Sequence, residues 1–299
     1  GQAFVFVYPD GENAIVIVGG ANRAWPAELP KDLVRAIETA SVVLVQCEIN
    51  PEVNDLVVDI AFKAGVPIMW DVGGDDRAMS KDILNKITYL CPNETELARL
   101  ANKEVASTEQ AVEVARHMQS LGAKNMLVTL GSYGSVFVPE TGDVIHQRCF
   151  KVDNVVDTTG AGDCYRGAFA VALAEGKSIQ DSMEFAAAAI DDTLIMAGNN
   201  STVLVIGSVD TDVIVEIDRL PLRGETLSAS KPDTGKVVPG GKGSNQAVAA
   251  AKLMATGSVK FAGQFGNDSR GAMVERALQQ VGVDTELCDK PACPLGQAF

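Results

Sequence analysis

Short apolar runs alternate with amphipathic stretches along most of this chain, and this alternation constrains its fold more than any other feature. Residues 42–47 (VVLVQC) form the kind of run that is buried on both faces in a parallel sheet. Residues 107–122 follow the period of a helix, with Ser107 as the N-cap and Gly122 as the stop. Strands that alternate with helices predict an α/β fold with a mostly parallel sheet, covered by helices on both faces.

The same patterns assign the other segments. Residues 3–8 and 13–18 form a predicted hairpin, because the PDGE between them has the chemistry of a turn. Asn93 is predicted to cap a helix that begins at residue 94. Further strands are expected at 66–70, 88–91, 126–129, 202–206 and 259–262, and further helices at 51–65, 80–87, 160–175, 178–191, 244–253 and 269–280.

One loop has the composition of a catalytic anion site. Residues 157–163 read DTTGAGD and lead into an apolar helix, whose free N–H groups form an anion-binding start. A carboxylate at this point, Asp163, would oppose an anion unless it takes a proton from a hydroxyl while the amides hold a phosphoryl group. The alternative is a plain glycine-rich helix cap with Asp163 as a first-turn acid.

Three candidate site residues fall just after predicted strands. They are Asn93, Gly131 and Asp163. Because sheets of this kind bind ligands beyond the carboxyl ends of their strands, we expect the site at that edge.

The charge of the chain limits its partners. Its 299 residues carry a formal net charge of −14, which argues against nucleic acid or an anionic membrane. We expect neither a bilayer-spanning run nor a signal peptide. The six cysteines show no CxxC spacing, which favours reduced thiols in a cytoplasmic protein. With two histidines, a histidine zinc site or a Ser-His-Asp triad is not expected.

The tetrapeptide GQAF occurs twice, at residues 1–4 and 296–299. Four residues are too few for a structural repeat. The repeat suggests a sequence that was closed on itself and reopened within one strand, and Gly1 in place of Met fits an engineered or processed end.

In cyclic order, the motifs resemble those of the PfkB-type, ribokinase-like sugar kinase family. With residue 299 joined to residue 1, the order is GSVDTD (207–212), GGKGSNQA (240–247), GQFGND (263–268), GQAF, GEN (11–13), GAN (20–22), QCE (46–48), NETE (93–96), VTLG (128–131) and DTTGAGD. The resemblance covers nearly the whole chain apart from 191–201. It implies a circularly permuted member with a doubly wound sheet and a small β-sheet lid over the sugar.

The resemblance also implies an activity and its residues. The family's reaction would be phosphate transfer from ATP to the primary (5-)hydroxyl of D-ribose. Asp163 would be the base, and the backbone of Gly160, Ala161 and Gly162 the anion hole. The sugar hydroxyls would be held by Asp210, Asp212, Gly241, Lys242, Asn245 and Glu48. The family usually has Asn where this chain has Asp210, which changes the polarity of that hydrogen bond.

The remaining implied residues concern the nucleotide and its ions. Asn93, Thr129, Gly131 and Gly134 would line the nucleotide site. Glu96, with Asn93, would organise Mg²⁺ indirectly. Asp157 and the carbonyl of Thr159 match the family's monovalent-cation ligands, and K⁺ is the implied ion.

Simpler interpretations of several of these residues stay open. Lys242 and Asn245 could cap the helix at 244–253, and Glu96 could be an acid that complements a helix dipole. Asp212 could be an ordinary turn residue. Glu48 ends a buried strand and is hard to explain as solvated surface, which favours a ligand contact.

The expected lid consists of strands at 213–217, 226–230, 3–8 and 13–18. We expect the α/β core to comprise 19–212 and 240–290, with a seam near 191–201, and the lid to comprise 1–18, 213–239 and 291–299. Such a lid sheet exposes an apolar face unless it pairs with another copy, so a homodimer through the lid is expected.

Two rival functions remain. One is a kinase of the same family that acts on another furanose or on a nucleoside. The other is a permuted sugar-binding scaffold with impaired turnover, because residues 191–200 stand where the family has a loop beside the nucleotide base.

Overall fold

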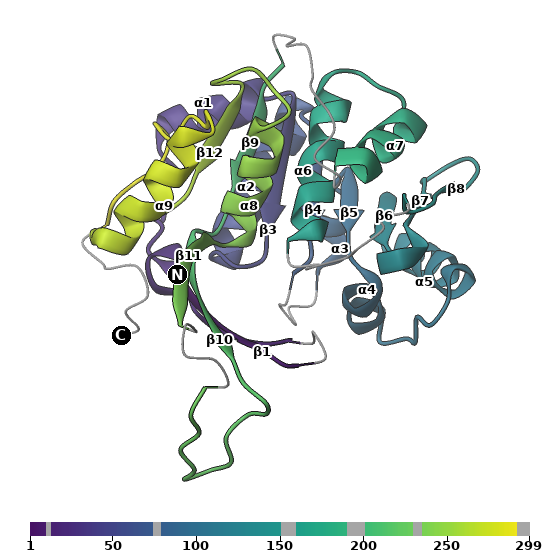
Figure 1. Ribbon diagram of the computed structural model, residues 1–299. Coiled ribbons are helices and arrows are strands. Elements are labelled where there is room, and N and C mark those ends of the chain that lie inside the picture. The colour runs from purple at the N-terminus through teal and green to yellow at the C-terminus, as the bar shows by residue number, and fades with distance from the viewer. Residues whose placement is uncertain (10–12, 74–78, 151–159, 190–200, 230–234, 292–299) are drawn as a thin grey trace.

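A computed structural model of the chain describes residues 1–9, 13–73, 79–150, 160–189, 201–229 and 235–291 (Figure 1). In these ranges the expected α/β architecture is confirmed: a large sheet lies between two layers of helices, and a smaller sheet lies at one end. The strands are β1 (Gln2–Val7), β2 (Asn13–Val18), β3 (Val42–Gln46), β4 (Ile68–Asp71), β5 (Tyr89–Cys91), β6 (Asn125–Thr129), β7 (Ser135–Val138), β8 (Ile145–Gln147), β9 (Val203–Ile206), β10 (Asp210–Glu216), β11 (Lys236–Gly240) and β12 (Val259–Ala262). The helices are α1 (Lys31–Thr39), α2 (Pro51–Ala64), α3 (Lys81–Leu84), α4 (Glu94–Ala101), α5 (Thr108–Ser120), α6 (Ala161–Ala174), α7 (Ile179–Ala189), α8 (Lys242–Ala251) and α9 (Ser269–Gln280), with short 3₁₀ turns η1 (Gly20–Arg23) and η2 (Gly131–Tyr133).

The large sheet has the strand order β12-β9-β3-β4-β5-β6-β7-β8. The six strands from β12 to β6 are parallel, and β7 and β8 pair antiparallel at the far edge. The carboxyl ends of the parallel strands therefore meet at one edge, which is the edge where doubly wound sheets bind their ligands.

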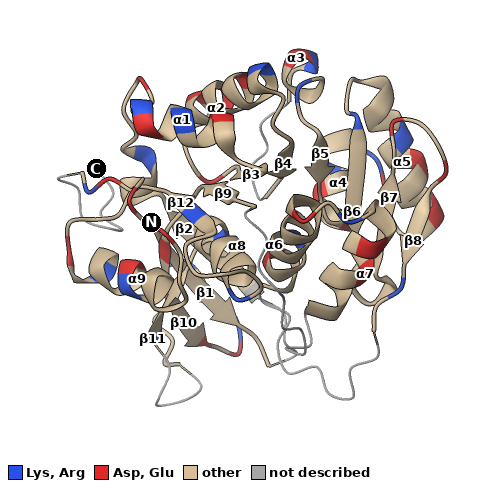
Figure 2. Ribbon diagram, turned by 90° about the horizontal axis from the view of Figure 1, so that it is seen from above, with Lys and Arg blue, Asp and Glu red and all other residues tan. Residues whose placement is uncertain are grey.

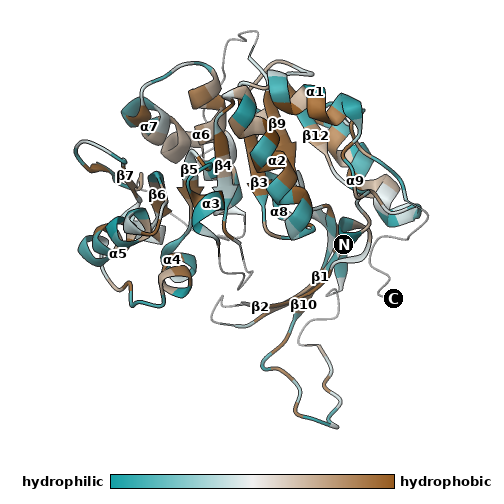
Figure 3. Cartoon of the chain, turned by 180° about the vertical axis from the view of Figure 1, so that it is seen from behind, coloured by the Kyte–Doolittle hydropathy of each residue, from teal (hydrophilic) through white to brown (hydrophobic). Residues whose placement is uncertain are grey.

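Alternating side chains of the sheet build two separate cores. Val43 and Val45 of β3 belong to the core under α1, α2, α4 and α5, whereas Val42 and Leu44 belong to the core under α6 to α9. Figure 3 shows this arrangement as brown strands between helices that are partly teal. Charged residues lie mainly on the outer ribbons of helices such as α2, α5 and α9 (Figure 2).

The small sheet has the order β11-β10-β1-β2. β1 lies parallel to β10 and antiparallel to β2, so segments from opposite ends of the sequence are neighbours. The prediction of a strand at 226–230 was wrong: residues 226–229 are exposed and form no strand, and the strand that pairs with β10 is β11. The physical reason is that residues 226–229 (TLSA) contain only one large apolar side chain, whereas β11 offers Val237 and Val238 to β10. Pro239 is tolerated there because β11 is an edge strand.

Candidate active site

Asp163 lies in the first turn of α6 and is buried, with 6% of its surface exposed. Three side chains of α8 reach its carboxylate: Asn245 Nδ2 donates to Oδ2 at 3.1 Å, Gln246 Nε2 donates to Oδ1 at 3.3 Å, and Lys242 Nζ lies 3.9 Å from Oδ1. Burial is the largest cause that raises the pKa of Asp163, and the positive charge of Lys242 opposes it. The structure thus brings the DTTGAGD and GGKGSNQA motifs together around one carboxylate.

The backbone conformation and the packing before Asp163 require glycine at two positions. Gly160 is the N-cap residue of α6 and has a φ of 77°, a conformation that favours glycine. A Cβ at Gly162 would lie 2.7 Å from Nη1 of Arg166. Between them, Ala161 begins the helix, so the backbone N–H groups of its first turn point towards the carboxyl edge of the sheet without intrahelical acceptors.

Two further acids lie close enough to Asp163 for their charges to interact with it. Glu48 follows β3, and its Oε2 is buried with no hydrogen-bond partner among the described residues. Burial raises the pKa of Glu48 to about 8, with the charges of Asp71 and Asp163 adding to the shift and Lys242 opposing it. Burial also raises the pKa of Asp212 to about 6, and Asp210 and Asp163 add to that shift.

Asp210 is engaged by the chain itself. Its Oδ1 accepts a hydrogen bond from Asn22 Nδ2 at 3.0 Å and lies 3.3 Å from the Gly1 nitrogen. Gly241 packs directly against this segment, because a Cβ there would lie 2.8 Å from the Asp210 nitrogen. Close packing within the chain therefore explains why residue 241 has no side chain.

Sequence reasoning missed two central residues, Asp71 and Arg166. Asp71 is 2% exposed at the end of β4, and its Oδ2 lies 3.3 Å from Arg166 Nη1 and 3.7 Å from Lys242 Nζ. An acid at the end of a buried strand was the signal used for Glu48, and it would have found Asp71 too. No sequence pattern pointed to Arg166, because it lies within the apolar part of α6.

Arg166 joins α6 to α4. Its guanidinium donates to the Cys91 carbonyl through Nε and Nη2 at 3.1 and 2.9 Å, and Nη2 lies 3.4 Å from Glu96 Oε2. Glu96 also completes the capping box of α4 with Asn93, since Asn93 N donates to its Oε2 at 2.8 Å. The interpretation of Glu96 as a helix-start acid is therefore correct, and the ion pair with Arg166 comes in addition.

The residues expected to line the nucleotide site lie at the end of β6, in the turn after it, and at the N-cap position of α4. Asn93 and Thr129 form a parallel bridge, and Gly131 and Gly134 lie in the turn after β6 with φ angles of 52° and 89°.

An open cavity of about 930 Å³ lies beside α6 and is lined by Gly160, Asp212 and Asn245, among others. Asp157 and Thr159 lie outside the described residues.

No group of three or more acidic, histidine or cysteine side chains with the arrangement of a metal site occurs in the described ranges. Glu96, whose Oε2 is already occupied by Asn93 and Arg166, fits contact with Mg²⁺ through water.

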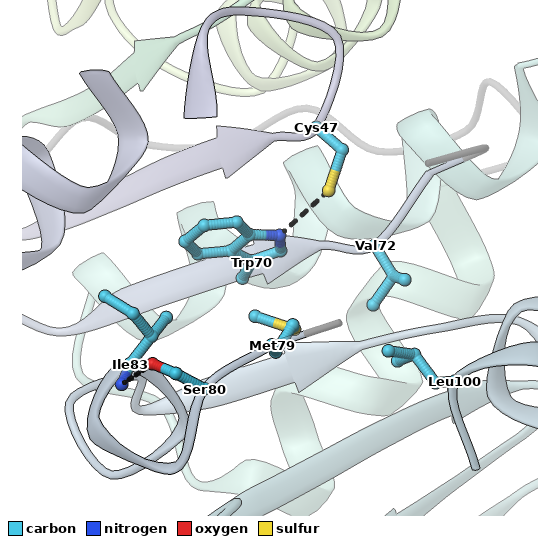
Figure 4. A pocket seen from close by; sticks show the side chains of 7 residues that line it. All are labelled: Cys47, Trp70, Val72, Met79, Ser80, Ile83 and Leu100. Atoms are coloured by element: carbon cyan, nitrogen blue, oxygen red, sulfur yellow. Dashed lines mark hydrogen bonds between the residues drawn. The ribbon is translucent and has the colours of Figure 1, made fainter. Parts of the chain in front are cut away.

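A small apolar pocket lies behind the site (Figure 4). In it, Trp70 Nε1 donates to Cys47 Sγ at 3.2 Å, which ties the end of β3 to the end of β4. The volume is about 10 Å³, room for roughly one water molecule. The pocket is thus a small gap in the packing beneath the strand ends that carry Glu48 and Asp71, the residues next to Cys47 and Trp70.

Comparison with known proteins gives consistent matches. The model of the pfkB family of carbohydrate kinases matches residues 1–190 and 200–299. A ribokinase from Arabidopsis thaliana is 44% identical over 190 residues, which are 63% of this chain and 50% of that protein. A ribokinase from Schizosaccharomyces pombe is 33% identical over 213 residues, which are 70% of this chain and 66% of that protein.

Solved structures agree with these matches. The structure of the Arabidopsis thaliana ribokinase complexed with ribose and ATP is similar with a TM-score of 0.60 at 43% identity, over 64% of this chain and 61% of that one. The matched segments therefore span about half to two thirds of the relatives' lengths. Within the described ranges, no helix has the length and apolar character needed to cross a bilayer.

Proposed function

The chain belongs to the pfkB family of carbohydrate kinases, and on this basis we propose that it transfers the γ-phosphoryl group of ATP to the primary (5-)hydroxyl of D-ribose. The observation that carries the proposal is the convergence of Asp163, Asn245 and Lys242 at the start of α6. The relatives named ribokinase, one of them solved with ribose and ATP, support the choice of substrates.

In this proposal Asp163 is the base. Its carboxylate takes the proton of the 5-hydroxyl as the hydroxyl oxygen bonds to the γ-phosphorus and the bond from that phosphorus to ADP breaks. The raised pKa of Asp163 makes it a stronger proton acceptor than an exposed carboxylate. The backbone N–H groups of Gly160, Ala161 and Gly162 hold the charge on the transferred group.

The sugar is held by the groups around the base. Lys242, Asn245, Asp212 and Glu48 surround Asp163, and Asp210 at the start of β10 and Gly241 at the N-cap of α8 close the site. With a pKa of about 8, Glu48 carries a proton at neutral pH, so it can both donate to and accept from a hydroxyl.

The nucleotide lies on the other side of α6, along Thr129, Gly131 and Gly134. Glu96 and Asn93 would hold Mg²⁺ through water, and Asp157 and Thr159 would bind K⁺. When bound, Mg²⁺ would neutralise charge on the phosphates of the nucleotide.

We further propose that the two matched blocks are permuted relative to the family. Counted from β9 through residue 291 and then from β1, the strands of the large sheet stand in the order 2-1-3-4-5-6-7-8. This is the pattern of a doubly wound sheet of the 2-1-3-4-5 kind. The core would then be 19–212 with 240–290, and the lid 1–18, 213–239 and 291–299.

The test is the acceptor specificity of the purified protein. ADP release would be measured with D-ribose, other pentoses, fructose and adenosine in the presence of ATP, Mg²⁺ and K⁺, and the product examined by phosphorus NMR. Ribose 5-phosphate as the main product supports the proposal. Faster turnover of another acceptor favours the rival kinase, and thermal stabilisation by ribose without ADP release favours the binding scaffold.

A further inference from the structure

Two buried glutamines of the sequence motifs have no part in the proposed function. Gln46 ends β3 and Gln246 belongs to GGKGSNQA on α8, and their surfaces are 0% and 1% exposed. Gln46 Nε2 donates to Gln246 Oε1 at 2.8 Å. Gln246 Nε2 in turn donates to Asp71 Oδ2 at 2.8 Å and to Asp163 Oδ1 at 3.3 Å.

This chain of hydrogen bonds fixes which way the Gln246 amide faces. If the amide were rotated by half a turn, its oxygen would face two carboxylates and its NH₂ group would face the NH₂ group of Gln46. Each of these two contacts in the rotated amide would leave buried polar groups without partners, and the free energy lost in this way exceeds what a hydrogen bond contributes. Gln46 therefore holds the two protons of Gln246 against Asp71 and Asp163.

The charged groups around Asp163 explain why a neutral donor matters here. They come from four other places in the fold and from α6 itself, and are Asp71 (β4), Glu48 (after β3), Asp212 (β10), Lys242 (α8) and Arg166 (α6). Asp71 faces the base with a like charge. An amide shared by both carboxylates stabilises them side by side, without adding a further cation to Lys242 and Arg166 that would weaken the base.

We propose that Gln246, oriented by Gln46, is a positioning residue that fixes the carboxylate of Asp163 beside Asp71. The inference deepens the proposed function, since it rests on Asp163 as the base. Gln246 acts through Asp163 and needs no contact with either substrate.

The test uses Gln246→Met, which keeps the length of the side chain and removes both donated hydrogen bonds. The titration of the Asp163 carboxyl carbon is followed by carbon NMR, with the signal assigned by its loss in Asp163→Asn. Loss of a donor to an ionised carboxylate predicts a titration midpoint higher by about one pH unit. With ribose, kcat should fall by about tenfold to a hundredfold, its acid limb should move to higher pH, and KM for ribose should change by less than about threefold.

Gln46→Met removes the group that orients Gln246 without touching Asp163, and we expect a smaller shift of the midpoint in the same direction. The matched control is Gln264→Met, since Gln264 is also a buried glutamine (3% exposed) but makes no hydrogen bond to Asp163 in the described part of the chain. This control should leave the midpoint in place. If Gln246→Met does not fold, the comparison of Gln46→Met with Gln264→Met decides in the same way.

An unchanged midpoint in folded Gln246→Met would overturn the proposal, and so would equal shifts in Gln246→Met and Gln264→Met. If the unmodified protein does not turn over ribose, the proposed function fails, and the NMR titration still decides the role of Gln246.

Discussion

Glu48 shows at the scale of one residue how burial shapes this site. Its pKa is raised from 4.5 to about 8, mainly by burial. The folded protein therefore keeps a proton on Glu48 at pH values where the unfolded chain has released it. The resulting stabilisation is complete below about pH 4.5 and is lost as the pH rises towards about 8.

Glu48→Gln should remove this dependence, because the amide does not titrate. We expect the free energy of unfolding of the variant, relative to that of the unmodified protein, to be higher at pH 8 than at pH 5, as measured by urea denaturation at both values. Glu113→Gln, an exposed change on α5, is the control and should give the same small difference at both pH values. Equal differences for Glu48→Gln at pH 5 and pH 8 would show that Glu48 is ionised in the folded protein.

The sequence alone identified residues whose motif is local, and it missed those whose role depends on several elements. Asp163, Lys242 and Asn245 stand in recognisable motifs, and the structure brings them together. Asp71 and Arg166 acquire their role only where β4, α4 and α6 meet, and Arg166 is 95 residues from Asp71 and 70 residues from Glu96 along the chain. No periodicity or spacing in the sequence indicates that these three elements come together.

At the scale of elements, the position of Asp163 depends on the close packing of α6 and α8. Gly167 lies at their contact, where a Cβ would be 2.8 Å from the Gln246 carbonyl oxygen and 3.0 Å from Ala249 Cβ. The absence of a side chain at this one position lets Asn245 and Gln246 reach Asp163.

Gly167→Ala should therefore destabilise the protein by about 1–3 kcal/mol through overpacking. In an open helix interior the same change stabilises by about 1 kcal/mol, so the sign of the change is diagnostic. Chemical denaturation measures it. A stabilised variant would mean that the two helices can separate at no cost.

Helices and strands were predicted correctly where the apolar pattern of the sequence fits one kind of element. The expected strand at 259–262 and helix at 269–280 match β12 and α9, because a continuous apolar run and an amphipathic pattern leave little choice. The strand expected at 226–230 was wrong, since the strand at this edge, β11, is short and mostly exposed, and its place is set by its pairing with β10.

At the scale of the whole molecule, the small sheet has two unlike faces. Phe4, Val16 and Val213 are register partners and share one face, while Asp212 pairs with Ala3 on the opposite face, the face of the proposed sugar site. Val16 is 55% exposed. We propose that the first face forms the interface of a homodimer.

Val16→Lys places a charge in that interface and should convert the dimer to a monomer in sedimentation experiments. Leu121→Lys is the control, since Leu121 is 44% exposed at the end of α5, far from the small sheet, and should leave the mass unchanged. A Val16→Lys protein that stays dimeric would place the interface elsewhere.

The most direct test of the whole account is ribose-dependent ADP release by the unmodified protein and by Asp163→Asn. The account predicts release that requires ribose and falls by about 10²–10⁴-fold in the variant, while the variant stays folded and still binds ribose. Ribose-dependent release that survives in Asp163→Asn would contradict the role of Asp163 as the base, and with it the proposed mechanism.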